Sequence, residues 1–407
     1  MINNKSWFKL SLFYFILVAL VGVLLRSYPF FDEIPFEFRN LIHSHSHVAM
    51  LGWVFNVLLL GITREFLSNT WIQTRFFRWL FWGIQVSIIG MLISFALQGY
   101  AVWSIVFSTA HILFSYAMIT RIVIDIKLWQ SMQSVSRKLL LGSLAFLFLS
   151  SLGPWGLAIL AANGMAGTPL YKSAIYWFLH FTYNGWMTLA LLAIWLKVTK
   201  IKSPKAELGL TLLLTSIPLS FILSLYEFEL HMLWHIAGIA IGVVQFLGIC
   251  WVISSWLKRQ RFFSSSFLDM LFKFSLVMLL LKSLLQIISA VPSVNTLAFF
   301  NRDVVILYMH LVFIGWISIA CILYGYYLLD LGSNSSARIS TILFLLGFII
   351  QEVELVIHSL GIGKEFPLSH ESILLLSATL MLTGTVGIFM SLWSSKNVPR
   401  IRSIQGD

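Results

Sequence analysis

The sequence predicts an all-α integral membrane protein of about twelve transmembrane helices. Three observations carry this prediction: the composition is too apolar for a soluble protein, apolar runs of spanning length recur along the chain, and the basic residues lie between those runs. Of the 407 residues, 59% are apolar and 11% are charged, and the mean hydropathy is +0.89. Soluble domains carry about twice that share of charged residues.

The apolar runs follow one another from end to end, so we expect a single polytopic membrane domain over residues 1-407 with little mass outside the bilayer. A helix needs about 20 apolar residues to cross the hydrocarbon core. The expected spans lie at roughly 7–27, 40–63, 76–98, 102–124, 139–162, 173–196, 208–228, 231–256, 267–291, 304–329, 339–361 and 367–394.

The formal net charge of +11 indicates membrane topology rather than nucleic-acid binding. Lys and Arg gather in the N-terminal segment, the loops after even-numbered spans and the C-terminal tail. The opposite side has only Arg26, Arg39, Lys172, Arg302 and Lys364. By the positive-inside rule both termini face the cytoplasm, and every even-numbered helix runs from outside to inside. The lipid bilayer is the expected partner.

A motif of the form His-x4-Gly-Trp occurs three times, and its copies begin at His47, His180 and His310. The copies are almost equally spaced, and they fall in the first third of the second, sixth and tenth spans. This spacing predicts three pseudo-equivalent arcs of four helices, with internal repeats at roughly 7-125, 138-257 and 266-394.

A second series, His111, His235 and His370, lies near the starts of the fourth, eighth and twelfth spans. All six histidines are on inward-running helices, so we expect them to share a depth in the outer half of the membrane. A lone membrane histidine is often a satisfied contact between helices. Six at matched depth favour ligation of a cofactor, because intramembrane ionisable groups are costly and usually mark a site.

The stretch LIHSHSHVAMLGWVF, residues 41–55, places three histidines at alternate positions. Helical residues four apart share a face, whereas residues two apart point about 200° away from each other. His43 and His47 therefore share a face and His45 looks the other way, so one helix can contact cofactors on both sides. Neutral imidazole is an axial ligand for haem iron and also binds copper or non-haem iron.

The glycine and tryptophan that end each motif copy have two interpretations. The glycine can allow the close approach of a neighbouring helix or of a flat ring, with the tryptophan as an aromatic wall. Alternatively, both are ordinary helix-packing residues.

The eighth span offers a candidate metal site, since Glu227, His231 and His235 follow one another at i, i+4 and i+8. On one helix they form a stripe that suits non-haem iron, or copper if the carboxylate stays outside. The alternative is that Glu227 lies in the outer loop and is solvated.

Three further ionisable residues within spans are candidates for a proton path. Glu352 and Glu354 reach the outer half from the eleventh span, and Glu354 stands four residues before His358. These carboxylates can move protons or orient an imidazole, or Glu354 and His358 can satisfy each other. Lys282 lies inside the ninth span, where snorkelling is less convincing, and it is a candidate for a proton path or for pairing with a haem propionate.

Two segments resemble a known family. His45-Ser-His47-Val-Ala-Met-Leu-Gly52 is similar to the His-x-His-x4-Gly segment of the NnrS family of haem- and copper-containing membrane proteins, and Leu179-His180-Phe-Thr-Tyr183 resembles their later Leu-His-x-x-Tyr segment. Twelve spans in three arcs, with histidines in helices two, six and ten, also look like the haem–copper oxidase subunit I superfamily.

The resemblance implies a cofactor set. It implies a haem held between His47 and His310. We expect this haem to be b-type, and His43 and His45 are further candidates for contact with it. It implies copper or non-haem iron at His180. The candidates for a second metal are His180, His231, His235, Glu227, His111 and His370.

The chain also departs from the oxidase pattern. The seventh span lacks an adjacent histidine pair, and Tyr308 stands where an oxidase has the ligand of its oxygen-binding haem. The standard binuclear centre is therefore not expected.

The expected function is a haem-binding, and also copper-binding, protein of the bacterial inner membrane that handles or senses a small diatomic gas such as nitric oxide or oxygen. Its electron donor is not identified. One alternative is an oxidoreductase, an oxygen or nitric oxide reductase with a divergent metal centre. Another is a histidine-lined metal or proton transporter. The sequence has no Gly-rich phosphate loop and no CxxCH motif, which disfavours ATP-driven transport and covalently attached haem.

Overall fold

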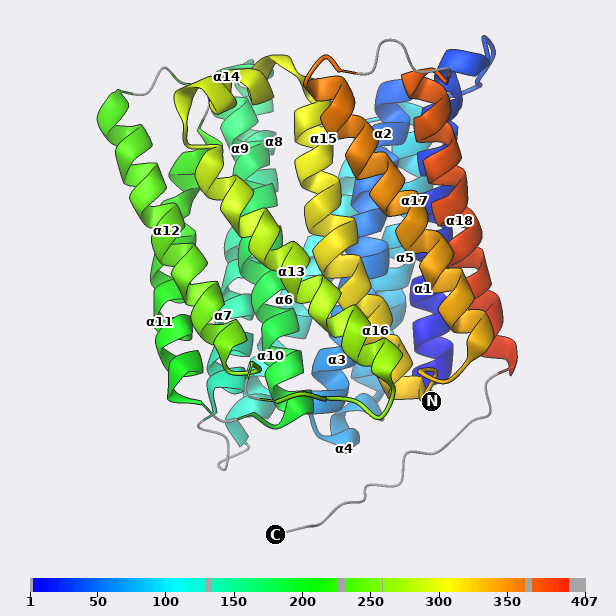
Figure 1. The fold of residues 1–407 in the computed structure, drawn as a ribbon, viewed down its shortest axis with the longest axis vertical. Helices are drawn as coiled ribbons and strands as arrows, with labels where there is room; N and C mark the ends of the chain where they lie inside the picture. The colour runs from blue at the N-terminus through cyan, green and yellow to red at the C-terminus, as the bar shows by residue number, and fades with distance from the viewer. Residues whose placement is uncertain are drawn as a thin grey trace.

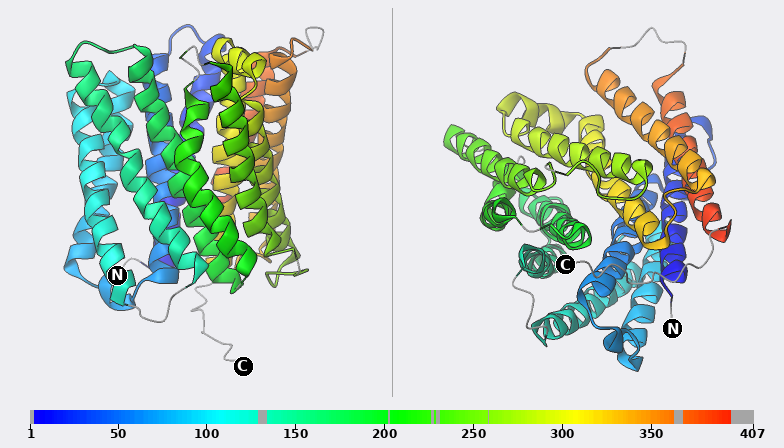
Figure 2. Two further views of the ribbon diagram at one scale, coloured as in Figure 1. Left: turned by 90° about the vertical axis from the view of Figure 1, so that its left-hand side faces the viewer. Right: turned by 60° about the horizontal axis from the view of Figure 1, so that its bottom comes forward.

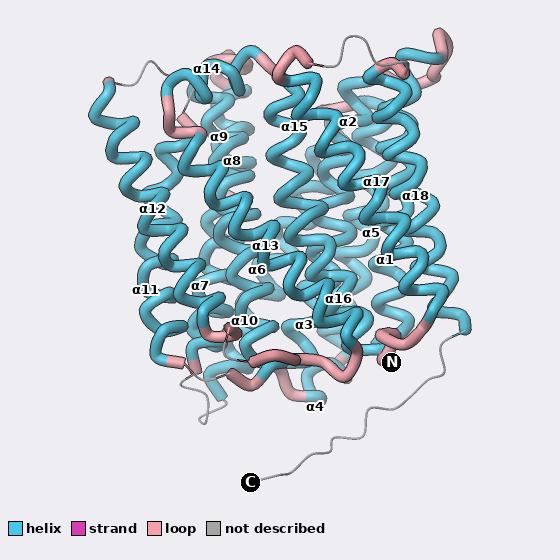
Figure 3. The backbone as a smooth tube through the Cα atoms, in the orientation of Figure 1, coloured by secondary structure: helices cyan, strands magenta, loops and turns pink. Residues whose placement is uncertain are grey.

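Helices make up the regular structure of this protein. The computed structural model describes residues 3–128, 134–201, 203–225, 228, 231–257, 259–362 and 368–394. Within these residues every regular element is a helix and no strand occurs (Figure 3). The long helices run side by side between the same two ends of the molecule, as Figures 1 and 2 show from three directions.

The helices follow one another in chain order with short connections. Those in the first third of the chain are α1 (Asn4–Ser27), η1 (Tyr28–Phe30), α2 (Phe38–His47), η2 (Val48–Val54), α3 (Phe55–Phe66), α4 (Asn69–Ile72), α5 (Arg75–Gln98) and α6 (Val102–Leu128). The next are α7 (Val135–Ser150), α8 (Leu152–Ala162), α9 (Pro169–His180), η3 (Phe181–Met187), α10 (Thr188–Thr199), α11 (Pro204–Leu219), η4 (Ser220–Ser224) and α12 (Met232–Ser254). The last are α13 (Ser266–Ile288), α14 (Pro292–Phe300), α15 (Arg302–His310), η5 (Leu311–Ser318), α16 (Ile319–Leu329), α17 (Ser335–Ser359) and α18 (His370–Ser394).

Eleven helical segments of the described chain are long and apolar enough to cross a membrane, which indicates a multi-pass membrane protein. The expected span at 173–196 is helical as α9, η3 and α10 in succession, but it is not among the eleven. Polar residues such as His180 and Asn184 lower its hydropathy. The span expected at 208–228 lies four residues earlier in the structure, at Pro204–Ser224, where α11 contains Pro218 and passes into η4, which ends at Ser224.

Local signals in the sequence define several helix boundaries. The Asn3 side chain accepts a hydrogen bond from the backbone N–H of Ser6 at 2.7 Å and caps α1. Thr168 caps α9 in the same way, with Pro169 in the first helical position. Gly99 ends α5 with a φ of 62°, a left-handed backbone that glycine adopts without strain.

Each copy of the histidine motif passes into a π-helix directly after its histidine. η2 follows His47, η3 follows His180 and η5 follows His310. π-Helical turns are rare in proteins, and many of those that occur are at functional sites. The three motif copies therefore share a backbone feature that their neighbours in the described chain do not show.

The motif tryptophans contact one another's helices in a cycle. Each indole contacts a residue of another motif copy. That residue stands two positions after the tryptophan of its own copy. The pairs are Trp53 with Ser318 (Nε1 to Oγ, 2.9 Å), Trp316 with Thr188 (Nε1 to Oγ1, 3.2 Å) and Trp186 with Phe55 (ring centroids, 6.1 Å). Phe55 offers no acceptor, so Trp186 Nε1 is buried without a hydrogen-bond partner among the described residues.

The motif glycines serve close packing against neighbouring helices. A Cβ on Gly185 would come within 2.6 Å of the Phe146 side chain on α7, and one on Gly315 within 2.9 Å of Phe348 on α17. These sites are filled by aromatic side chains of the protein itself. The helix-packing interpretation of the glycines therefore holds here, and the alternative of a flat ring against them does not.

α1 begins and α18 ends at the same end of the molecule, whereas α2, α15 and α18 begin at the opposite end (Figure 1). The histidines of the second and tenth spans thus enter from one side. Which end faces the cytoplasm stays a prediction.

Candidate functional site

His45 looks from α2 toward α1. Its Nδ1 lies 3.0 Å from the carbonyl oxygen of Val18. A Cβ on Gly22 would come within 3.3 Å of the imidazole, so this glycine makes room for the ring. The charge of His45 interacts with His310 at the end of α15, and the charge of Arg26 interacts with both imidazoles. The charges of His45 and Arg26 therefore both act on His310.

His310 is oriented by α17, because its Nδ1 lies 2.5 Å from Nε2 of Gln351. With Nε2 of Gln351 facing it, Nδ1 accepts and the ring proton sits on Nε2; after a half turn of the amide, Oε1 instead accepts a hydrogen bond from Nδ1–H. In that arrangement the second ring nitrogen, Nε2, is left without a proton and can bind a metal.

His47 looks the other way from α2, toward α5 and α6. Its Nδ1 lies 2.9 Å from the carbonyl oxygen of His43, and its ring stacks on Phe95 with 4.2 Å between centroids. His43 packs edge-on against Tyr100 at 4.7 Å. His47 is within electrostatic range of His111 on α6. The expected opposition of His45 to His43 and His47 is therefore present in the structure.

His111 carries an unpaired buried nitrogen. Its side chain is 2% exposed, and Nε2 has no hydrogen-bond partner among the described residues. Nδ1 lies 3.4 Å from Ser115 Oγ, and the ring packs edge-on against Phe55 at 5.0 Å. An unsatisfied buried polar atom costs about 1–3 kcal/mol. Nε2 of His111 is thus placed to bind a ligand.

Two of these imidazoles have the proton arrangement of metal-bound histidine. His45 and His47 each direct Nδ1 to a backbone carbonyl, which places the proton on Nδ1 and leaves Nε2 bare. Protein ligands of metals are usually held in this way by a second hydrogen bond. The donor set therefore fits axial ligation of haem iron.

The electrostatic neighbours of these histidines differ from the pair that the resemblance implies. The resemblance implies His47 with His310, whereas the charges that act on His310 come from Arg26 and His45, and His47 acts on His111. The reason is the turn of about 200° between positions two apart on a helix. α2 thus stands between two histidine pairs.

His180 has no ring nitrogen left for the metal that was expected there. Its Nε2 lies 2.8 Å from the carbonyl oxygen of Ile217, and its Nδ1 lies 3.2 Å from Nδ2 of Asn184. The side chain is 1% exposed. The structure assigns this histidine to the packing of η3 against α11.

Lys282 lies in a cage of amides. Its Nζ donates to Oδ1 of Asn184 and, at 2.8 Å, to Oε1 of Gln286, while Gln286 donates onward to Gln245 at 3.4 Å. The side chain is 1% exposed, and none of the described carboxylates forms an ion pair with it. Its expected role in a proton path or with a propionate stays a prediction.

The expected stripe on the eighth span does not form at its histidines. α12 begins at Met232, and His231 is its N-cap, exposed and accepting from the N–H of Leu233 at 3.3 Å. His235 directs Nδ1 to the carbonyl oxygen of Ala290 at 3.0 Å. Because His231 precedes the helix, the i, i+4 relation does not place the two rings together. Glu227 lies outside the described residues.

A second cluster lies where α15, α17 and α18 meet. His370 Nδ1 lies 2.8 Å from Oε1 of Glu354, and His358 Nδ1 lies 2.7 Å from Oδ2 of Asp303. The two imidazoles stack at 3.7 Å. The alternative in which Glu354 and His358 satisfy each other is therefore wrong, because each takes its partner from another helix. Glu352 has a buried Oε1 that no described residue bonds, and its expected proton role stays a prediction.

Asp303 is not among the predicted site residues, because the expected tenth span begins one residue later, at 304. Its position could have indicated a role, because Asp303 stands in the first turn of α15, after the N-cap Asn301, and seven residues before His310. Residues seven apart share a helical face.

No family model matches this chain, and no curated protein matches it either. Its function is therefore argued from the geometry of its own residues.

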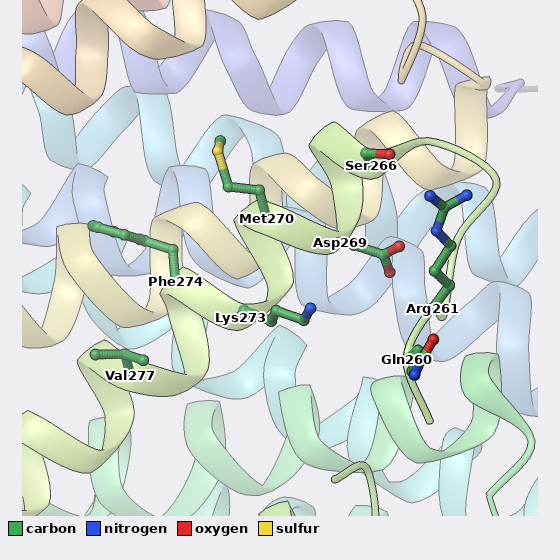
Figure 4. A pocket seen from close by; sticks show the side chains of 8 residues that line it. All are labelled: Gln260, Arg261, Ser266, Asp269, Met270, Lys273, Phe274 and Val277. Carbon is green, nitrogen blue, oxygen red and sulfur yellow. The ribbon is translucent and has the colours of Figure 1, made fainter. Parts of the chain in front are cut away.

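A hollow of about 460 Å³ lies at the beginning of α13 (Figure 4), at the end of the molecule opposite the starts of α2, α15 and α18 (Figure 1). Charged lining residues are Arg261, Asp269 and Lys273. Asp269 Oδ1 accepts from the N–H groups of Phe262 and Phe263, at 2.8 and 3.2 Å. The Asp269 carboxylate thus fixes the loop that precedes α13. None of the residues that line the hollow is one of the histidines described above.

Proposed function

We propose that this chain is a haem-binding membrane protein in which haem iron is held between paired histidines on either side of α2. The observation that carries the proposal is a set of four imidazoles whose Nδ1 atoms are held by the protein. We pair His45 with His310 and His47 with His111, because the charges of each two interact. The b-type is proposed because no covalent attachment motif is present.

The residues around the pairs support this assignment. Arg26 is within range of His45 and His310 and supplies a positive charge for the propionates of a haem held there. Phe95 stacks on His47 and Phe55 packs on His111, so apolar rings exclude water from the second pair. A haem iron with two imidazole ligands exchanges single electrons.

Electron transfer or redox sensing in the bacterial inner membrane is the role that follows. An oxygen or nitric oxide reductase would need an open coordination position at a metal. His180, which would carry that second metal, has both ring nitrogens bonded to the protein. The reductase alternative therefore has less support than an electron carrier or a sensor related to these gases.

The proposal includes twelve spans in three pseudo-equivalent arcs, with both termini in the cytoplasm. The π-helix after each motif histidine and the cycle of tryptophan contacts support the arcs. The excess of Lys and Arg in loops on one side supports the topology.

The test is the absorption spectrum of the detergent-purified protein from cells supplied with haem, oxidised and dithionite-reduced, with a pyridine haemochrome assay. We expect a Soret band and sharp reduced α and β bands. His45→Ala and His310→Ala should remove one and the same spectral component, because each variant takes one axial ligand from the same iron. His47→Ala and His111→Ala should remove another.

His231→Ala is the matched control, since His231 is exposed at a helix cap and its loss should leave the spectrum unchanged. A colourless wild-type protein would sink the haem proposal and leave the histidine-lined metal or proton transporter as the next reading. If His47→Ala and His310→Ala remove the same component while His45→Ala removes none, haem is present but the pairing is wrong.

A further inference from the structure

Three helices that are distant in the chain bring nitrogen and oxygen ligands together at one end of the molecule. Asp303 lies in the first turn of α15, His358 near the end of α17, and His370 is the first residue of α18. One ligand atom from each residue lies within 4.8 Å of the other two. This end is the one opposite the beginning of α1 (Figure 1).

His370 already has the orientation of a metal ligand. Its Nδ1 is held by Oε1 of Glu354 at 2.8 Å, and its Nε2 faces Oδ2 of Asp303 at 3.9 Å. Two ligands of a tetrahedral zinc ion, each about 2.0–2.2 Å from it, lie about 3.4 Å apart. The gap between His370 and Asp303 is therefore wide enough for a cation, and Glu354 completes a carboxylate–imidazole–metal arrangement.

His358 supplies the third ligand. Its Nδ1 lies 2.7 Å from Oδ2 of Asp303, which is closer than two ligands of one ion lie, so the ring must move back by less than about 1 Å to admit a cation. The His358 side chain is 51% exposed and stacks on His370. Such a movement therefore pushes aside solvent and no buried side chains. The same exposure opens the site to solution.

The charges of the cluster suit a divalent cation. Asp303 and Glu354 are acidic, and Arg26 and Arg302 nearby offset part of that charge. Two imidazolium rings stacked at 3.7 Å would repel each other, whereas metal binding requires both imidazoles neutral. Two nitrogens and a carboxylate oxygen are a zinc-type donor set, while magnesium and calcium prefer oxygen ligands throughout.

We propose that Asp303, His358 and His370 bind a divalent cation of the zinc class, with water in the fourth position and with Glu354 positioning His370. The cation ties the ends of α15, α17 and α18 together. Asp303 lies two helical turns before His310 on the same helix. The proposal stands independently of haem, because it uses none of the four nitrogens assigned to haem iron.

The test uses the full chain, purified in detergent and stripped of metal with a chelator. Cobalt is added first, because tetrahedral cobalt shows d–d absorption bands in the visible range, and zinc then displaces it. Zinc stoichiometry and affinity are measured by calorimetry. We expect one equivalent of zinc in the wild type and strong weakening in Asp303→Asn and in His358→Ala, each of which removes a ligand. Glu354→Gln should weaken binding by about 10- to 100-fold.

His231→Ala is the control, as another exposed histidine at the start of a helix. Circular dichroism and the haem spectrum establish that each variant is folded. The proposal is overturned if the wild type binds no zinc, or if folded Asp303→Asn and His358→Ala bind it as the wild type does. A colourless protein that still binds cobalt at this site would refute the haem proposal and support this one.

Discussion

Lys282 shows how a single buried charge is accommodated among the helices. Its ammonium group has amide oxygens of Asn184 and Gln286 as acceptors, and Asn184 passes the contact on to His180. Removing an ion from water costs several kcal/mol unless hydrogen bonds replace the lost hydration. His180, which was expected to bind metal, instead closes this chain of hydrogen bonds.

Replacing Asn184 by Ala should therefore destabilise the protein more than replacing Lys282 by Met. Asn184→Ala leaves the buried ammonium short of an acceptor and should lower the free energy of unfolding by about 1–3 kcal/mol or more. Lys282→Met removes the charge itself and leaves only amide oxygens unpaired. The midpoint of thermal unfolding in detergent measures both, with Asn163→Ala, an exposed amide, as the control. The opposite order would contradict the role of the cage.

At the scale of elements, the π-helices after the motif histidines set how closely neighbouring helices approach. The hydroxyl of Thr188 donates to the carbonyl oxygen of Tyr183, five residues earlier, at 2.6 Å and so satisfies a carbonyl of η3. Gly185 lies in the middle of that segment against Phe146. The segment is thus held both by its own hydrogen bonds and by its neighbour.

Gly185→Ala should destabilise the protein, whereas Gly156→Ala should not. A Cβ on Gly185 would lie 2.6 Å from Cβ of Phe146, which forces α7 and η3 apart and costs about 1–3 kcal/mol. A Cβ on Gly156 meets nothing closer than 3.8 Å, and alanine favours the helix by up to about 1 kcal/mol. Thermal unfolding of the two variants in the same detergent checks this. Equal midpoints would argue that α7 yields to the added methyl group.

At the scale of the whole molecule, indole contacts join the first, second and third parts of the chain around a common centre. Trp53 bonds to Ser318 and Trp316 bonds to Thr188, while Trp186 packs on Phe55. The residue that each indole contacts has a hydroxyl in two cases, Ser318 and Thr188, and an aromatic ring in the third, Phe55. Phe55, the one residue of the cycle that offers no hydroxyl, also packs on His111, a proposed haem ligand.

Ser318→Ala should lower the free energy of unfolding by about 1–3 kcal/mol, because it leaves Trp53 Nε1 buried without an acceptor. Chemical unfolding followed by tryptophan fluorescence measures the change. Ser336→Ala is the matched control, since Ser336 is exposed in the first turn of α17. If the two variants unfold alike, the contact between Trp53 and Ser318 does not hold the parts of the chain together.

Local features of the candidate site were predictable, and non-local ones were not. The opposite directions of His45 and His47 follow from helical periodicity alone. The cap at His231 was missed because the apolar run gives no boundary finer than a few residues. Asp303 was missed because its importance comes from His358 and His370, which lie on two other helices.

The sequence by itself determined that this is a membrane-type bundle of apolar helices, that its motif histidines repeat, and that α2 presents imidazoles on two sides. These properties depend on composition and on periodicity within one helix. Only the tertiary structure decided that the charge of His45 acts on His310, that His47 acts on His111, and that His180 is satisfied by Ile217 and Asn184. The physical reason is that a helix fixes the direction of each side chain about its own axis, whereas the partner it meets depends on how separate helices pack.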